Sequence, residues 1–303
     1  MRIVFMGTPD FAVACLAALV DSSHDICGVI TAPDKPAGRG QKMHESAVKK
    51  YAEKHDLTIL QPTNLKDENF TKELRNLNAD LFVVVAFRML PEVVWKMPPH
   101  GTFNLHASLL PQYRGAAPIN WAVINGESLS GVTTFFLQHE IDTGNIIKQV
   151  EVPIAPNDTA GDLHDKLMQV GAKLVVETAD AIAAGTVAPQ PQKDVENIQH
   201  APKIFKPDCE IKWDQKTKTV YNFIRGLSPY PAAHTYIYKD KEQLQLKIFQ
   251  ATPIEEQHTK APGTIERIDK KSFRIATQDG WILPTTVQLQ GKKKMNTQDL
   301  LNG

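Results

Sequence analysis

The sequence of 303 residues predicts an α/β protein with an open, mostly parallel, Rossmann-like sheet, followed by a small C-terminal β-barrel of the OB-like kind. Three observations predict this fold class. Apolar runs typical of buried strands alternate with segments of helical periodicity in the first half of the chain. A proline-rich stretch then interrupts this pattern. Five short strand-like segments with polar interruptions follow it.

The first elements of the predicted sheet follow one another closely. Residues 2–6 form an apolar strand that ends at Gly7, after which Thr8 is predicted as the N-cap and Pro9 as the first residue of a helix. Strand, helix and strand in this order predict parallel pairing with right-handed crossovers. Further strands are predicted over residues 25–31 and 80–87, and further helices over residues 45–55, 68–77 and 159–184.

The C-terminal third of the chain has a different pattern. Residues 185–207 carry four prolines and no clear period, which is typical of a linker. We therefore predict a catalytic domain over residues 1–188, a linker over 189–207 and a β-barrel domain over 208–303. The strands expected in the barrel cover residues 235–238, 244–251, 263–268, 272–276 and 281–289.

The composition excludes several classes of protein. The chain is 42% hydrophobic and 22% charged, so it can bury a core and is not globally disordered. No stretch approaches the roughly 18 consecutive apolar residues of a membrane span, and the first residues lack the pattern of a signal peptide. Cys15, Cys27 and Cys209 are too widely spaced for a zinc or redox motif. We therefore expect a cytoplasmic protein with no disulfide framework, no metal and no membrane partner. We also expect it to be a monomer.

The net charge of zero conceals an asymmetry between the two parts of the chain. Residues 1–204 carry 18 basic and 23 acidic side chains, and the remaining residues carry 16 and 11. A C-terminal part with an excess of positive charge suits contact with a polyanion, although a solvated, lysine-rich β surface has the same composition.

The most informative stretch begins at residue 101 and contains Asn104 and His106. Two residues apart on a predicted strand, their side chains point the same way. An amide donor beside an imidazole suits the stabilisation of negative charge on a carbonyl oxygen. A structural hydrogen-bonded pair at a strand end has the same spacing, so the pattern by itself leaves both readings open.

A carboxylate, Asp142, precedes a Thr-Gly turn after a strand predicted over residues 132–137. At a strand end in an open sheet, this group can face the ligand crevice. There it can hold His106 as imidazolium or pass a proton through a water molecule. The alternative is an Asx turn capped by Asp142.

A cationic loop is predicted over residues 34–42, directly after the second strand. Two glycines flank Arg39, and Lys35 and Lys42 stand on either side. Such a loop can wrap a phosphate backbone, with forked contacts from the arginine, or it is a plain surface loop. The turn after the first strand lacks the GxGxxG pattern, which argues against NAD or a nucleoside triphosphate as ligand.

Taken together and in this order, these motifs resemble those of the enzymes that take a formyl group from 10-formyltetrahydrofolate. The resemblance is carried by Asn-Leu-His-Ala-Ser-Leu-Leu-Pro at 104–111, Tyr-Arg-Gly-Ala-Ala-Pro-Ile at 113–119 and Asp-Thr-Gly at 142–144. It implies the formyltransferase fold, 10-formyltetrahydrofolate as the donor and no metal. The catalytic residues that it implies are Asn104, His106 and Asp142, and the folate-binding residues are Ser108, Leu109, Leu110 and Pro111.

Within this family, the opening Met-Gly-Thr-Pro-Asp-Phe-Ala at 6–12, the cationic loop and the C-terminal β module resemble members that formylate the α-amino group of methionyl-initiator tRNA. That resemblance implies tRNA contacts by Lys35, Arg39 and Lys42, tRNA binding by the barrel, and a bacterial cytosol. Two alternatives remain. One is a formyltransferase for a small amine, such as a ribonucleotide or an amino sugar, which would need neither the loop nor the barrel. The other is a non-catalytic RNA-binding protein.

Overall fold

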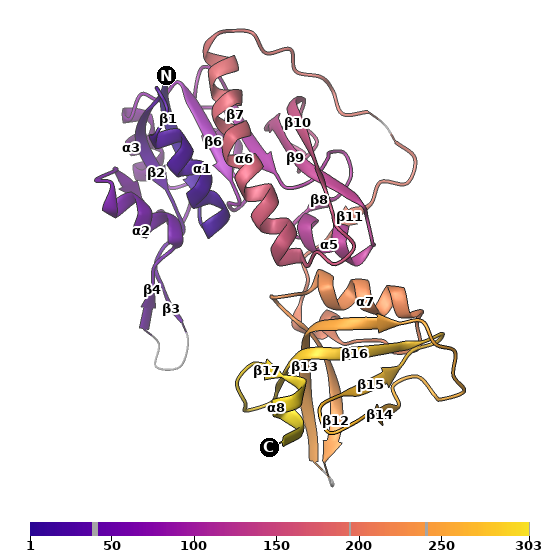
Figure 1. Cartoon of the computed structure of the whole chain (residues 1–303). Helices are drawn as coiled ribbons and strands as arrows, with labels where there is room; N and C mark the ends of the chain where they lie inside the picture. Colours follow the sequence, from indigo (N-terminus) through magenta and orange to yellow (C-terminus); the bar gives the residue numbers. More distant parts are fainter. Residues whose placement is uncertain (38–41, 194, 240–241, 303) are drawn as a thin grey trace. The chain divides into compact units, whose positions relative to one another are not determined.

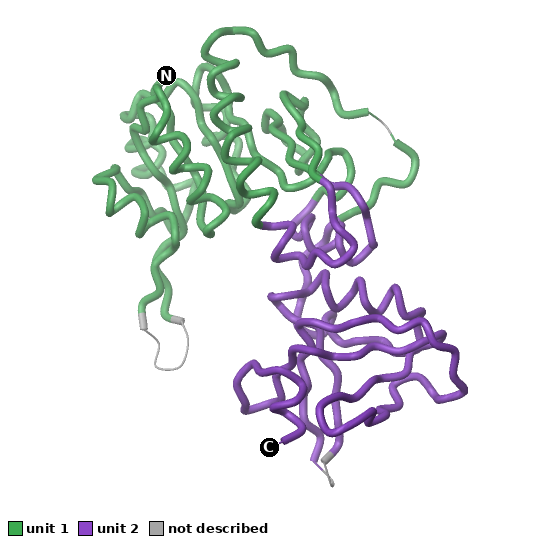
Figure 2. The backbone as a smooth tube through the Cα atoms, in the orientation of Figure 1, with its two compact units in different colours: residues 1–114, 131–152, 165–200 green, residues 115–130, 153–164, 201–303 purple. Residues whose placement is uncertain are grey.

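Two compact units make up the protein in a computed structural model, which describes residues 1–37, 42–193, 195–239 and 242–302. Unit 1 consists of residues 1–114, 131–152 and 165–200, and unit 2 of residues 115–130, 153–164 and 201–303 (Figure 2). The chain therefore passes from one unit to the other more than once before its C-terminal third begins.

A seven-stranded sheet lies at the centre of unit 1, with the strand order β10-β9-β7-β6-β1-β2-β5 (Figure 1). The pairs β1–β2, β1–β6, β2–β5 and β6–β7 are parallel, and β9 is antiparallel to β7. The mostly parallel sheet is thus confirmed. Its strands are β1 (Arg2–Gly7), β2 (Asp25–Ile30), β5 (Ile59–Leu60), β6 (Leu81–Val85), β7 (Thr102–His106), β9 (Leu129–Phe136) and β10 (Ile146–Pro153).

Helices cover both faces of this sheet. On one face, Phe70 of α3 (Glu68–Asn76) and Val94 of α4 (Glu92–Trp95) share an apolar cluster with Val84 of β6. On the other face, α6 (Ala160–Ala183) approaches β7 so closely that a Cβ on Gly171 would lie 2.8 Å from the Leu105 side chain. The remaining helices of unit 1 are α1 (Asp10–Val20) and α2 (Ala47–Lys54).

The start of α1 differs from the sequence prediction by one residue. Pro9, predicted as the first helical residue, is instead the N-cap, and the helix begins at Asp10. The reason is the backbone of Pro9, whose ψ of 177° is extended, while its carbonyl oxygen already accepts a hydrogen bond from Ala12 N at 2.9 Å. The predicted N-cap Thr8 is therefore wrong.

The cationic stretch predicted as a loop over residues 34–42 contains a short hairpin. Its strands β3 (Lys35–Ala37) and β4 (Lys42–His44) pair antiparallel. The base is fixed by Asp34, which accepts hydrogen bonds from Lys49 Nζ at 2.5 Å and Gln61 Nε2 at 2.8 Å, and the bond from Lys49 is the main cause of a lowered pKa of Asp34. Arg39 lies outside the described residues, as does the side chain of Lys42.

A curled antiparallel sheet, a half-barrel, forms most of unit 2, which confirms the small C-terminal β module. Its strand order is β12-β13-β16-β15-β14, with β17 paired to β16. All five strands predicted from the sequence are present, and Ile224 of α7 (Thr217–Gly226) packs into the same core as Ile248 and Ile282. The strands are β12 (Ala233–Lys239), β13 (Glu242–Ile254), β14 (Ile265–Arg267), β15 (Phe273–Ala276), β16 (Trp281–Leu289) and β17 (Met295–Asn296).

Unit 2 also contains a helix from the middle of the chain, α5 (Pro118–Ile124). This helix packs directly on α7: a Cβ on Gly226 would lie 2.5 Å from Ile124 Cγ1, and Asn120 Nδ2 donates a hydrogen bond to Gly226 O at 2.8 Å. Within the described part of the chain, no helix has both the length and the apolar character needed to cross a membrane. The remaining elements are β8 (Arg114–Gly115), β11 (His200–Ala201), the 3-10 helix η1 (Lys206–Cys209) and α8 (Thr297–Asn302).

Candidate active site

Asn104 and His106 project from one face of β7, in the strand that the sequence predicted for them. Asn104 pairs in register with Val84 of β6, and residues in register on neighbouring strands share a face. Val84 belongs to the apolar cluster beneath α3 and α4. The two polar side chains therefore extend the α3–α4 face of the sheet at the edge of its core.

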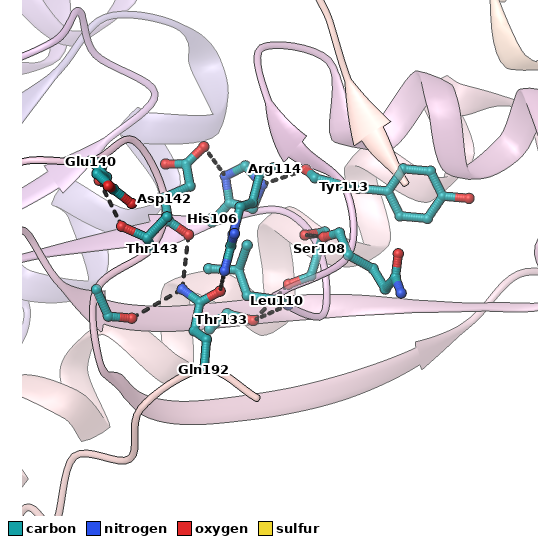
Figure 3. A network of polar contacts seen from close by, with 12 residues as sticks. His106, Ser108, Leu110, Tyr113, Arg114, Thr133, Glu140, Asp142, Thr143 and Gln192 are labelled. Atoms are coloured by element: carbon teal, nitrogen blue, oxygen red, sulfur yellow. Dashed lines mark hydrogen bonds and ion pairs between the residues drawn. The ribbon is translucent and has the colours of Figure 1, made fainter. Parts of the chain in front are cut away.

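His106 has a defined orientation. The residue is only 7% exposed, and its Nε2 lies 2.8 Å from the backbone oxygen of Tyr113 (Figure 3). Because a carbonyl oxygen can only accept, Nε2 carries the proton of this hydrogen bond. The other ring nitrogen, Nδ1, faces Asp142.

Asp142 lies beside His106, as the sequence predicted for these two residues. Its Oδ2 is 3.9 Å from His106 Nδ1, and its side chain is 17% exposed. This distance exceeds a hydrogen bond, so the two groups form an ion pair when the ring is protonated.

The route that brings Asp142 to His106 differs from the expected strand-end placement. Because β9 is antiparallel to β7, its last residue, Phe136, pairs with Phe103 near the start of β7, whereas His106 is the final residue of β7. Residues 137–145 must therefore fold back along the sheet. Two backbone features shape this return: Asp142 has a left-handed φ of 55°, and a Cβ on Gly144 would overlap the backbone oxygen of Phe136.

Gln192, which the sequence analysis did not identify, holds this turn, and Arg114, quoted there only as part of the motif at 113–119, holds Gln192. Gln192 donates through Nε2 to the backbone oxygens of Asp142 at 2.8 Å and Gly144 at 3.0 Å (Figure 3). Its Oε1 accepts from Nε and Nη2 of Arg114, at 3.1 and 2.6 Å. Gln192 is 50 residues from Asp142 and 78 from Arg114 along the chain. Local spacing carries no signal for such a contact.

The amide of Asn104 is the donor that this network leaves available. The side chain is half-buried, and among the described residues it has no hydrogen-bond partner. A polar group in this environment gains free energy when a ligand supplies an acceptor. Asn104 and His106 Nδ1 are therefore the groups on this face that can meet a carbonyl oxygen.

The segment predicted to hold the folate ring, Ser108 to Pro111, is fixed by buried hydrogen bonds. Ser108 Oγ donates to Gln112 O at 2.6 Å, and Thr133 Oγ1 donates to Ser108 O at 2.6 Å and accepts from Leu110 N at 3.2 Å. The side chains of Ser108 and Leu110 are buried. What this segment can offer a ligand is thus its backbone and the half-buried Leu109 and Pro111.

A cavity of about 520 Å³ lies where the chain leaves β6. It is lined by residues 63–66 and 88–91, with the cations Lys66 and Arg88 among them. The Arg88 guanidinium donates to the backbone oxygens of Pro62 and Thr63, so its position is fixed. The sequence analysis did not predict this cavity. Among the described residues, no group of three side chains suited to hold a metal ion is present.

Comparison with protein families identifies the chain. The family described as "Formyl transferase" matches residues 1–179, and "Formyl transferase, C-terminal domain" matches residues 203–303. The chain belongs to the formyl transferase family. The family predicted from the motifs at 104–111 and 142–144 is thus confirmed, and the fold of both units is that of formyltransferases.

Relatives in the formyl transferase family match over the whole chain. The methionyl-tRNA formyltransferase of Bacteroides fragilis is 56% identical over 307 residues, covering all of this chain and 95% of that protein. The methionyl-tRNA formyltransferase of Flavobacterium johnsoniae is 53% identical over 303 residues, covering all of this chain and 96% of that protein.

Solved structures of more distant formyltransferases share the fold. An N-formyltransferase from Helicobacter canadensis, in complex with folinic acid and dTDP-3-aminofucose, aligns with a TM-score of 0.67 at 22% identity, over 94% of this chain and 98% of that one. HypX from Aquifex aeolicus, in complex with tetrahydrofolic acid, aligns with a TM-score of 0.68 at 20% identity, over 99% of this chain and 47% of that one.

Proposed function

We propose that this protein transfers the formyl group of 10-formyltetrahydrofolate to the α-amino group of methionyl-initiator tRNA. The observation that supports the proposal is that Asn104 and His106 share one face of β7 and Asp142 Oδ2 lies 3.9 Å from His106 Nδ1, in a chain that is more than half identical to methionyl-tRNA formyltransferases. This gives formylmethionyl-tRNA for translation initiation.

The chemistry sets modest demands on the protein. An α-amino group has an ordinary pKa of about 7.7–8.0, so a substantial neutral fraction is present at cellular pH. The site therefore needs no strong base to generate the nucleophile. It must stabilise negative charge on the formyl oxygen and deliver a proton to the departing nitrogen.

Asn104 and His106 suit the first of these tasks. The amide of Asn104 has no partner among the described residues, and His106 Nδ1 is the ring nitrogen not bound by Tyr113. In the imidazolium form both groups donate, so together they place two hydrogen-bond donors at the formyl oxygen. Fixed donors in a partly water-excluded site stabilise developing charge without reorganisation.

Asp142 suits the second task. Its carboxylate lies 3.9 Å from His106 Nδ1, where it would form an ion pair with the ring whenever the ring carries a second proton. The remaining exposure of the carboxylate leaves room for a water molecule to carry a proton between the two nitrogens of the reaction. We therefore assign Asp142 to orientation of His106 and to the proton relay.

We assign the folate donor to two features of unit 1. 10-Formyltetrahydrofolate supplies the formyl group when it is bound. The cavity lined by residues 63–66 and 88–91 combines apolar walls with Lys66 and Arg88, which suits a flat heterocycle joined to an anionic glutamate. The rigid backbone of Ser108 to Pro111 would support the ring, and the folate contacts of Leu109 and Pro111 belong to this proposal.

The tRNA contacts are assigned to two regions. Lys35 begins β3, Lys42 begins β4, and Arg39 lies between them in the sequence; we propose that these three residues bind the acceptor end by phosphate contacts. We propose catalysis by residues 1–188 and tRNA binding by residues 208–303, joined by the linker at 189–207. We also propose that the protein is a monomer in the bacterial cytosol and has no membrane partner.

A formyl-transfer assay with three acceptors tests the function: charged initiator tRNA, charged elongator methionyl-tRNA and a nucleotide-linked amino sugar, each with 10-formyltetrahydrofolate. We expect formylation of the initiator tRNA, much less of the elongator and none of the sugar. Transfer to the sugar alone would establish the small-amine alternative. Binding of tRNA without any transfer would establish the non-catalytic one.

A further inference from the structure

We propose, building on the function above, that Gln192 and Arg114 are a positioning pair that sets the placement of Asp142 over His106. Neither residue touches a reacting atom. Gln192 acts through the backbone of the Asp142 turn, and Arg114 acts by holding Gln192, so the placement of the carboxylate depends on the segment around residue 192.

The orientation of the Gln192 amide follows from its partners. Arg114 can only donate, and the backbone oxygens of Asp142 and Gly144 can only accept. The glutamine oxygen must therefore face the guanidinium and its nitrogen must face the turn. Every hydrogen-bonding group of the side chain is used in a role that only an amide can fill, because a carboxylate would have no donor and an amine no acceptor.

Gln192 binds the backbone of a residue in a left-handed conformation. Asp142 adopts a left-handed φ of 55°, a conformation that only a few non-glycine residues adopt. Gln192 Nε2 binds the carbonyl of that same residue and the carbonyl of Gly144 two positions later. Fixing both carbonyls fixes the direction in which the Asp142 side chain leaves the backbone.

Gln192 is held in reach by the main chain beside it. Gln190 and Ile146 form an antiparallel bridge, with N–O distances of 2.8 and 2.9 Å in the two directions. Ile146 begins β10, directly after the Asp142 turn. The segment at 190–192 is thus anchored to the end of the turn by backbone bonds and to its middle by the Gln192 side chain. The side chain of Gln190 is exposed and donates to Ala188 O nearby.

Arg114 connects the same network to the histidine. The preceding residue, Tyr113, accepts the hydrogen bond from His106 Nε2. Tyr113 therefore orients the imidazole of His106 through its backbone oxygen, and Arg114 orients the amide of Gln192 through its guanidinium (Figure 3). His106 is thus positioned by Tyr113, and Asp142 by the next residue, Arg114, acting through Gln192.

The first test measures kcat and KM for Gln192→Met, Gln192→Glu and Arg114→Met. Because misplacement of a catalytic group by about 1 Å can cost 10²-fold, we expect kcat to fall by about 10- to 100-fold, with KM for folate and tRNA nearly unchanged. Gln192→Glu keeps an acceptor for Arg114 but sets oxygen against two carbonyls, so it should be no better than Gln192→Met. Gln190→Met is the matched control and should keep wild-type kcat. Unchanged kcat in all three variants would overturn the proposal.

The second test asks whether Gln192 acts through Asp142. On an Asp142→Asn background, Gln192→Met should lower kcat by less than about threefold, because the group that it positions is already lost. A full additional loss, equal to that in the wild-type background, would show that Gln192 supports the fold in general and would contradict the inference.

A third measurement separates this inference from the proposed function. Amide hydrogen exchange of residues 139–145 should accelerate in Gln192→Met and not in Gln190→Met, whichever substrate the enzyme formylates. If exchange accelerates while methionyl-tRNA is not formylated, the function fails and the positioning role stands. If exchange is unchanged, the positioning role fails by itself.

Discussion

His106 donates its Nε2 proton to the backbone oxygen of Tyr113 over 2.8 Å. This bond decides which nitrogen of the ring can act. Nδ1 is directed toward Asp142 and is the nitrogen that remains for a ligand. The ring has a second donor, at Nδ1, only when it is protonated. The carboxylate of Asp142, 3.9 Å from Nδ1, then forms an ion pair with that same nitrogen.

Removal of the donors at the formyl oxygen should therefore be costly. We expect Asn104→Ala and His106→Ala each to lower kcat by about 10²- to 10³-fold, because each deletes one stabilising donor, and Asp142→Ala to be comparable or worse. Single-turnover rates at saturating folate measure the effect. His100→Ala, at an exposed histidine just before β7, is the control and should be silent. A His106→Ala enzyme within a few fold of wild type would remove this assignment.

Arg39 should act on tRNA and not on folate. We expect Arg39→Ala to raise KM for charged tRNA and to flatten its dependence on salt concentration, because one phosphate contact is lost. Folate binding, measured by fluorescence titration, should be unaffected. Lys72→Ala removes an exposed cation on α3 and should change neither quantity. Impaired folate affinity in Arg39→Ala would contradict the prediction.

Gly144 should be intolerant of even one added carbon. A Cβ there would overlap the backbone oxygen of Phe136, so Gly144→Ala must displace the turn that carries Asp142. We expect a loss of at least about 10²-fold in kcat together with a lower Tm. Gly291→Ala is a comparison at a glycine with a φ of 78° and nothing within 4 Å of its Cβ. It should lower Tm slightly and leave kcat intact. Equal kcat in the two variants would refute the steric argument.

His234 should make unit 2 less stable in mild acid. The residue is only 3% exposed, and its pKa is lowered from 6.5 mainly by desolvation, with Lys206 and Lys247 acting in the same direction and Glu210 opposing them. A lowered pKa in the folded state means that the unfolded chain binds the extra proton. Stability is therefore complete above about pH 6.5 and is lost as the pH falls below that value.

Urea midpoints at about pH 7.5 and about pH 5 measure this effect. We expect a smaller difference between the two pH values in His234→Gln than in the wild type. His100→Gln, at an exposed histidine, should keep the wild-type difference. An unchanged pH dependence in His234→Gln would show that other groups cause the acid sensitivity.

Elements with a strong local signal were predictable from the sequence. The apolar run that became β6 and the long periodic helix α6 appear within a few residues of their predicted bounds, at Leu81–Val85 and Ala160–Ala183. The five strands of the half-barrel also match, because each combines strand formers with flanking turn residues. The pairing of Asn104 with His106 on one strand face followed from spacing alone.

Features set by contacts between distant segments were not predictable. Because β9 runs antiparallel to β7, it ends away from His106, and the turn that carries Asp142 reaches His106 only by folding back along the sheet. No local pattern specifies the direction of β9. Gln192 lies in a proline-rich stretch without periodicity, and its function depends on partners 50 and 78 residues away. The seven-residue helix α5 is too short for a clear helical period. The pairing of β3 with β4 was not predicted, because glycines and charged residues at 34–42 are typical of a loop.

The packing of α5 against α7 has a bearing on how this chain could be divided. If the chain were cut in the proline-rich stretch, Ile124 would stay in the larger, N-terminal fragment and lose its contact with α7. The smaller, C-terminal fragment would lose an apolar side chain that packs against its core. Neither fragment, produced alone, would have its complete apolar packing. Both fragments would need to be produced together to restore the packing of α5 against α7.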